Sequence, residues 1–149
     1  MKTASKQKGL AAVELVLITP IIIFLFVINI EVGKFLVENQ MLSKMVRNGA
    51  RFAITNVYGT ASGGAIAPLS EIQNMVVYGK PVVADDAAPL LPGLVPNDIS
   101  LDTSEEFEGF VVVTASHTYT PVFVKIPFTD ISFNVSYSAS SIMEKRNAL

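Results

Sequence analysis

The longest apolar run in the chain lies near its N-terminus. It extends from Leu10 to Ile30 and holds one charged side chain, Glu14. A helix over this stretch rises about 1.5 Å per residue, so its length matches the roughly 30 Å hydrocarbon core of a bilayer. No other stretch of the sequence is both long and apolar enough to do this. The pattern therefore predicts a transmembrane helix over residues 10–30.

Pro20 lies inside this predicted helix. A proline has no backbone N–H, so one helical hydrogen bond is lost and a kink is expected between Ile18 and Phe24. Within lipid, neighbouring helices can satisfy the backbone groups that this loss frees. The proline thus favours a helix that packs beside other helices.

Residues 31–55 continue the helical pattern as an amphipathic stretch. No helix breaker separates them from the apolar run, so a single helix from about Leu10 to about Ile54 is predicted. The apolar stripe has two interpretations, a core face packed on strands or a surface for partner helices, and both can hold along different stretches. The stripe consists of Val32, Phe35, Leu36, Met41, Leu42, Met45, Val46, Ala50, Ala53 and Ile54. The opposite, basic face carries Lys44, Arg47 or Asn48, and Arg51.

The remainder of the chain begins with turn-rich and short helical patterns. Residues 59–64 are rich in glycine and predict a loop. Residues 70–79 predict a short helix, with Glu71 in its first turn and Gly79 at its end. The proline-rich stretch from Pro81 to Pro96 predicts an extended connection, with a short strand at Val82 and Val83.

Three later segments have the character of strands. They are Ile99–Asp102, the valine- and threonine-rich Phe110–Tyr119, and Ile131–Ala139, in which apolar residues alternate with serine and asparagine. Strands this close in sequence most simply form an antiparallel meander. The predicted fold class is therefore α+β, with a long N-terminal helix, membrane half plus amphipathic half, packed on a small antiparallel β-sheet.

The distribution of charge orients the predicted helix in the membrane. The net charge of the 149-residue chain is −2, but Lys2, Lys6 and Lys8 precede the apolar run with no acid among them. The positive-inside rule then places residues 1–9, a disordered leader, in the cytoplasm. Residues 56–149 become an extracytoplasmic α+β domain. Without its leader the chain is more acidic still, which speaks against nucleic-acid binding.

Glu14 is the unusual residue of the span. A carboxylate at mid-depth in a bilayer costs on the order of 2.5–3.5 kcal/mol, and less near the interface, so an acid in this place predicts a function. A cleaved secretory signal is an alternative, but the apolar run is long and no Ala-x-Ala site follows it. A plain single-pass anchor is the other alternative.

The sequence offers no catalytic constellation. His117 is the only histidine, and it is expected to be a packed or half-exposed residue of a strand. There is no cysteine and no Gly-x-Ser-x-Gly elbow, so disulfides, thiolate metal sites and that type of nucleophile are excluded. The acidic residues at 85–86 and 105–108 are expected to lie in solvated loops rather than to form a calcium site. We therefore expect no enzyme, no metal and no cofactor.

Five spaced elements within residues 8–54 resemble a known family. They are Gly9 with Ala11-Ala12-Val13-Glu14-Leu15, then Pro20, Glu31-x-Gly33-Lys34, Gln40, and Arg47-Asn48-Gly49-Ala50-Arg51. In combination they resemble the TadE-like pseudopilins, minor pilins of the bacterial tight-adherence (Tad, or Flp, type IVb) pilus. Lys34 stands where family members often have arginine. The C-terminal two-thirds resemble the family only in general character.

This resemblance implies that a prepilin peptidase cuts between Gly9 and Leu10. Glu14 then becomes the fifth residue of the mature chain, and its carboxylate meets the new N-terminal ammonium of its own or a neighbouring chain. A buried charge with such a partner is far less costly than one alone, and removing either partner costs about 3–5 kcal/mol.

The resemblance further implies a pilin-like fold and a structural role in assembling or priming a Tad-type adhesive pilus. The implied partners are the prepilin peptidase, other minor pilins, the major Flp pilin, the inner-membrane assembly platform and membrane lipid. The implied location is the bacterial inner membrane, with the C-terminal domain periplasmic, or the pilus itself. The alternatives are an uncleaved single-pass membrane protein with a small extracytoplasmic binding domain, and a secreted enzyme.

Overall fold

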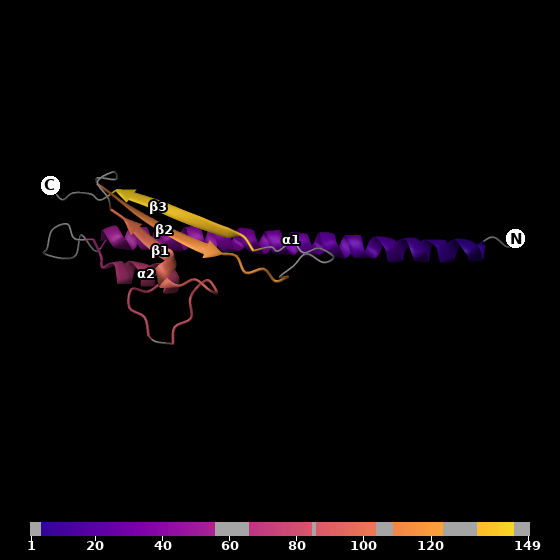
Figure 1. Cartoon of the computed structure of the whole chain (residues 1–149), viewed down its shortest axis with the longest axis horizontal. Coiled ribbons are helices and arrows are strands. Elements are labelled where there is room, and N and C mark those ends of the chain that lie inside the picture. Colours follow the sequence, from indigo (N-terminus) through magenta and orange to yellow (C-terminus); the bar gives the residue numbers. More distant parts are fainter. Residues whose placement is uncertain (1–3, 56–65, 85, 104–108, 124–133, 145–149) are drawn as a thin grey trace. The chain divides into compact units, whose positions relative to one another are not determined.

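The computed structural model describes residues 4–55, 66–84, 86–103, 109–123 and 134–144, with side chains from Gly9 onward. The chain divides into two compact units. One comprises Met1–Phe35 and Thr120–Asn134, and the other comprises Leu36–Tyr119 and Val135–Leu149. A single helix, α1, contributes residues to both units (Figure 1).

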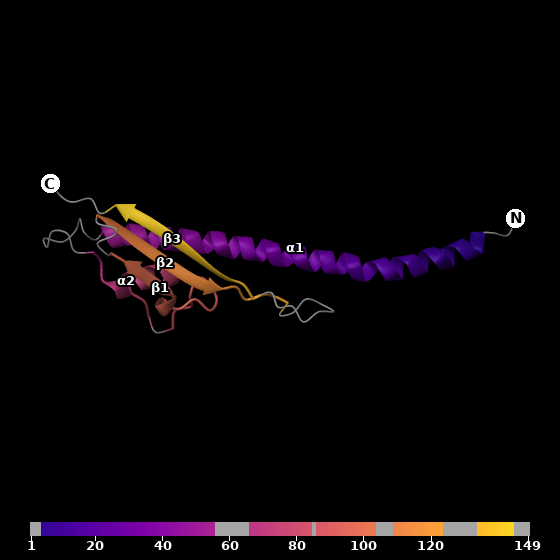
Figure 2. The same cartoon turned by 45° about the horizontal axis from the view of Figure 1, so that its top comes forward.

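The helix α1 extends over Ala4–Thr55, which confirms the prediction of one continuous helix and its C-terminal end. Its start is earlier than expected, because residues 4–9 are helical and not disordered. This stretch holds alanine, lysine and glutamine, which favour helix, and its single glycine weakens a helix by only about 1 kcal/mol. Pro20 does not interrupt α1, and Figure 2 shows the N-terminal part of the helix as a gentle curve.

The first half of α1 has the surface of a membrane span. Among the described residues, α1 is the one helix long and apolar enough to cross a bilayer, and the side chains of its apolar stretch are almost all exposed. Two of its polar side chains bond to the helix itself, since Thr19 Oγ1 donates to the Leu15 carbonyl and Asn29 Nδ2 to the Leu25 carbonyl, each at 2.7 Å. Exposed apolar side chains and internal hydrogen bonds both suit the bilayer core, which offers no hydrogen-bonding partners.

The second unit contains the short helix α2, Leu69–Tyr78, as predicted. Gly79 ends α2 with φ of 73°, a left-handed conformation that glycine adopts without strain, and its N–H donates to the Met75 carbonyl. A 3-10 turn, η2 (Pro96–Asp98), precedes the first strand. The expected strand at Val82 and Val83 is wrong, because neither residue pairs with another strand.

The three strands are β1 (Ile99–Asp102), β2 (Phe110–Thr118) and β3 (Ser136–Glu144). They form an antiparallel sheet in the order β1-β2-β3, which confirms the predicted meander. Ile99 lies opposite Ala115, and Ala115 opposite Ala139. The third strand is displaced toward the C-terminus relative to the prediction, and residues 131–133 of the predicted segment lie outside the described part.

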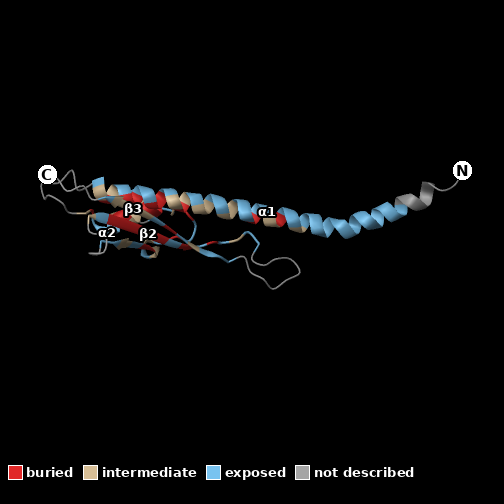
Figure 3. Cartoon of the chain, turned by 90° about the horizontal axis from the view of Figure 1, so that it is seen from above, coloured by how far each residue is buried: buried red, intermediate tan, exposed pale blue. Residues whose placement is uncertain are grey.

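The core of the second unit lies between the sheet and the two helices (Figure 3). The apolar stripe of α1 is therefore a core face from Leu42 onward, whereas Val32 and Leu36 are exposed. The buried cluster consists of Leu42, Met45, Val46, Ala50, Ala53, Ala67, Ile72, Val76, Val77, Leu91, Leu94, Ile99, Val111, Val113, Ala115 and Ala139. The predicted loop at 59–64 and the acids Asp85, Glu105, Glu106 and Glu108 lie outside the described residues.

Candidate functional site

The predicted processing and pairing residues lie on the exposed N-terminal part of α1. Gly9, Leu10, Glu14 and Pro20 are all exposed. Gly9 and Leu10 are consecutive residues inside the helix, so a peptidase that cuts between them acts on helical backbone or unwinds it locally. Glu14 follows Leu10 by four residues, which places the two on one face of the helix.

Glu31 has the opposite environment, because it is buried and bonded to a distant part of the chain. Its side chain is 2% exposed, and Oε1 accepts a hydrogen bond of 2.6 Å from the backbone N–H of Phe123. Phe123 follows β2, 92 positions away in sequence. A carboxylate that accepts a backbone N–H forms one of the stronger hydrogen bonds in proteins.

Lys34 forms a second bond to the same segment, one helical turn further along α1. Its Nζ donates to the carbonyl oxygen of Thr120 at 2.7 Å. Glu31 and Lys34 therefore hold the two ends of Thr120–Phe123, one through a backbone donor and the other through a backbone acceptor. We call these two bonds the α1 clasp. The acidic-x-Gly-basic element of the sequence thus has a structural role in this chain.

The two glycines of the predicted family pattern that follow Gly9 have different surroundings. At Gly33, an added Cβ would meet no described atom within 4 Å. At Gly49, which is buried in the second unit, an added Cβ would overlap with Cγ2 of Val76 on α2 and lie 3.7 Å from the carbonyl oxygen of Ile72. Gly49 therefore lies where α2 packs closely against α1.

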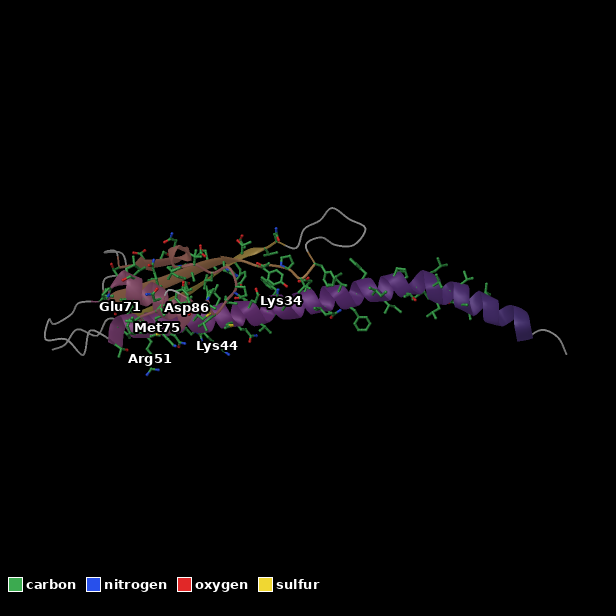
Figure 4. All side chains as sticks on the ribbon, turned by 90° about the horizontal axis from the view of Figure 1, so that it is seen from below. Lys34, Lys44, Arg51, Glu71, Met75 and Asp86 are labelled. Carbon is green, nitrogen blue, oxygen red and sulfur yellow. The ribbon has the colours of Figure 1, made fainter. Side chains whose placement is uncertain are left out.

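The polar residues of the pattern in the second unit line an exposed face of α1. Gln40, Lys44, Arg47 and Arg51 are all exposed. Figure 4 shows Lys44 and Arg51 pointing away from the strands. We call Lys44, Arg47 and Arg51 the basic face. The structure thus brings Glu31 and Lys34 together through the clasp, and leaves the basic face free of the core.

His117 on β2 and Tyr137 on β3 form an aromatic pair between neighbouring strands. His117 is buried, as expected for a packed strand residue, and its ring meets that of Tyr137 edge to face, with centroids 5.7 Å apart. Burial raises the pKa of the Tyr137 hydroxyl to about 12, with a further contribution from the negative charge of Glu38 on α1. The described residues hold no cluster of three or more metal-ligating side chains.

Sequence reasoning did not find Thr120–Phe123. The contacts of this segment are made by backbone N–H and C=O groups, which every residue type carries, so no residue pattern marks them. A partial signal exists in Pro121, Val122 and Phe123, which place apolar side chains directly after the strand.

Comparison with protein families identifies the model described as TadE-like protein, which matches residues 9–51. The match covers the apolar span, the acidic-x-Gly-basic element and the arginine-containing element, and it confirms the resemblance stated from the sequence. No curated protein and no solved structure matches the chain. The match covers 43 of the 149 residues, and all of them lie within α1.

Proposed function

We propose that this protein, TadE-like over residues 9–51, is a minor pilin or pseudopilin that takes part in assembling or priming a Tad-type adhesive pilus. The observation that carries the proposal is the combination of this match with the form of α1. One continuous helix has an exposed apolar half and a second half that forms part of the core of a small α+β unit. A helix with these two halves both anchors a subunit and offers a surface to neighbouring helices.

In this proposal, the prepilin peptidase cuts between Gly9 and Leu10. The new ammonium belongs to Leu10, four residues before Glu14. Residues at this spacing are neighbours on a helix, so Glu14 can pair with the terminus of its own chain or with that of an adjacent subunit. Either pairing offsets the cost of a carboxylate in the apolar layer, which makes entry into a helical bundle depend on processing.

The proposed partners are the prepilin peptidase, other minor pilins, the major Flp pilin and the inner-membrane assembly platform. The chain sits in the bacterial inner membrane, with its N-terminus cytoplasmic and its C-terminal domain periplasmic. The alternative is an uncleaved single-pass protein with a small binding domain outside the membrane. That alternative gives Glu14 no cationic partner.

Mass spectrometry of the protein from membranes with and without the peptidase separates the two proposals. We expect a mature chain that begins at Leu10 when the peptidase is present, and one that retains the leader when it is absent. Gly9→Leu is expected to block processing, because a bulky side chain before the cut hinders close approach of the protease to the backbone. An intact leader in cells that make pili would contradict the proposal.

A further inference from the structure

Two exposed apolar side chains lie at the α1 clasp. Val122 is 56% exposed and Phe123 is 38% exposed, although the backbone N–H of Phe123 is bonded to the buried Glu31. The clasp therefore fixes the backbone of the segment and leaves its apolar side chains uncovered by the described residues. The proposed pilus function assigns no role to this arrangement.

The clasp is attached to α1 at the edge of the predicted bilayer. Glu31 directly follows the last residue of the apolar run, Ile30, and Lys34 lies about 6 Å beyond Ile30 along the helix axis. The headgroup layer on each side of the hydrocarbon core is roughly 5–8 Å thick. A segment bonded to Glu31 and Lys34 is therefore held at the depth of the headgroups.

The covered face of α1 also continues into the apolar run. Val27 and Glu31 are the two buried residues among the described positions 9–35, and they are one helical turn apart on the same face. The remainder of this part of α1 is exposed or half-buried. The buried face of α1 that includes Glu31 thus extends to Val27, inside the predicted span.

We infer that Thr120–Phe123 is a membrane-docking segment, which the α1 clasp holds against the leaflet that α1 leaves at Ile30, with Val122 and Phe123 in the interfacial lipid layer. Lipid is the occupant that the observations favour, because the exposed apolar pair is continuous in depth with the span of the same unit. An apolar pair at this depth gains by leaving water, and the bilayer is already present wherever α1 is inserted.

The absence of tryptophan from the chain allows a direct test. The full-length Phe123→Trp protein would be reconstituted into phosphatidylcholine vesicles, with and without lipids brominated on the upper acyl chain. We expect blue-shifted tryptophan emission and loss of most of this emission in the brominated vesicles, since a tryptophan in the interfacial layer lies close to the bromine atoms.

Two matched variants make the result specific. Phe110→Trp replaces another exposed phenylalanine, 44% exposed, at the far end of β2, and is expected to emit as in water without quenching. Ile23→Trp lies within the span and reports whether α1 is inserted, so its emission must be quenched by the brominated lipid.

Adding Glu31→Ala to Phe123→Trp removes one bond of the clasp and is expected to reduce quenching of the tryptophan, whereas Glu31→Gln retains an acceptor and should restore part of this quenching.

The inference is overturned if Ile23→Trp is quenched and Phe123→Trp is not. Blue-shifted but unquenched emission from Phe123→Trp would also overturn it, because a protein surface would then cover the side chain. Equal quenching of Phe110→Trp and Phe123→Trp would contradict a specific docking segment. The test rests on the membrane span alone and requires neither cleavage nor pili, so its failure is distinguishable from failure of the proposed function.

Discussion

Glu14 and Glu31 are two carboxylates on one helix that have opposite environments. Glu31 is buried and accepts a backbone hydrogen bond, so its charge is satisfied within its own chain. Glu14 is exposed on the apolar half of α1. A charge in that position requires a partner that lipid does not provide. Of the two, the proposed function uses Glu14, the exposed one.

Substitution of Glu14 tests this difference. We expect Glu14→Gln and Glu14→Ala to be processed normally but to lower the number of pili at least about tenfold, because a lost pairing of about 3–5 kcal/mol exceeds the 1.4 kcal/mol of a tenfold change. The measurement is piliation by electron microscopy, together with the mass of the mature chain. Glu71→Gln is the matched control, a carboxylate on α2 outside the span, and should leave piliation unchanged. Normal piliation in both Glu14 variants would refute the pairing.

The raised pKa of Tyr137 predicts that the stability of the folded protein depends on pH in the alkaline range. Its pKa is raised to about 12 in the folded protein, against about 10 when unfolded, so folding favours the neutral hydroxyl. Its contribution to the free energy of unfolding is complete below pH 10 and is lost as the pH rises from 10 toward 12. We expect Tyr137→Phe to unfold with a weaker pH dependence over this range, measured by chemical denaturation in detergent.

The ultraviolet absorbance of tyrosinate reports the same group directly. The chain has four tyrosines, and one of them should ionise about two pH units above the usual value. Glu38→Gln should lower the pKa of Tyr137 only in part, because burial is the larger cause and remains. A titration of Glu38→Gln identical to that of the unmodified protein would contradict the electrostatic contribution of Glu38.

At the scale of elements, local sequence patterns determine where helices and strands form. The contacts between these elements depend on how their surfaces fit together. Periodicity and breakers predicted α1, α2, β1 and β2 within a few residues at most ends, since these signals are contained in short stretches of sequence. The third strand was displaced because alternation alone does not say which residues pair with β2. The bounds of β3 depend on its pairing with β2, such as His117 opposite Tyr137, and this pairing joins residues from two separate strands.

Gly49 gives a test of the contact between α1 and α2. In Gly49→Ala, the overlap with Val76 costs about 1–3 kcal/mol, and the better helix propensity of alanine recovers up to about 1 kcal/mol. At the middle of these ranges the net loss of stability is about 1–2 kcal/mol, seen as a lower unfolding temperature. Adding Val76→Ala removes the overlapping methyl, so the effect of Gly49→Ala should be smaller in that background.

Gly33→Ala is the matched control on the same helix. Its added methyl meets no described atom, so only the propensity term applies and stability should be unchanged or raised by up to about 1 kcal/mol. Equal destabilisation by Gly33→Ala and Gly49→Ala would show that close packing on Val76 is not what requires a glycine at position 49.

At the scale of the whole molecule, the basic face is a solvent-exposed surface of the second unit. Lys44, Arg47 and Arg51 are exposed and play no part in the buried core. Of the two interpretations of the apolar stripe, a core face applies from Leu42 onward, and a surface for partner helices stays a prediction for its exposed part. For the basic face we expect a partner whose surface is acidic.

Reversing charge on this face tests that expectation. Arg47→Glu combined with Arg51→Glu should leave the unfolding temperature nearly unchanged, because exposed substitutions typically shift stability by no more than about 0.5 kcal/mol. Recovery of other pilins by co-purification from membranes should fall about tenfold or more, since juxtaposed like charges cost a few kcal/mol. Lys80→Glu, an exposed change elsewhere in this unit, is the control. Equal recovery with all variants would exclude this face as an interface.

The sequence by itself determined the long helix, the apolar span, the position of Glu14 and the antiparallel order of the strands. Each of these depends on patterns that repeat within a few residues, or on the short distance between neighbouring strands. The tertiary structure alone decided that Glu31 and Lys34 bind the segment after β2, and that Gly49 receives α2. These contacts join backbone groups and surfaces that are far apart in the sequence. Which groups meet depends on how the folded elements fit together, so no short stretch of sequence predicts them.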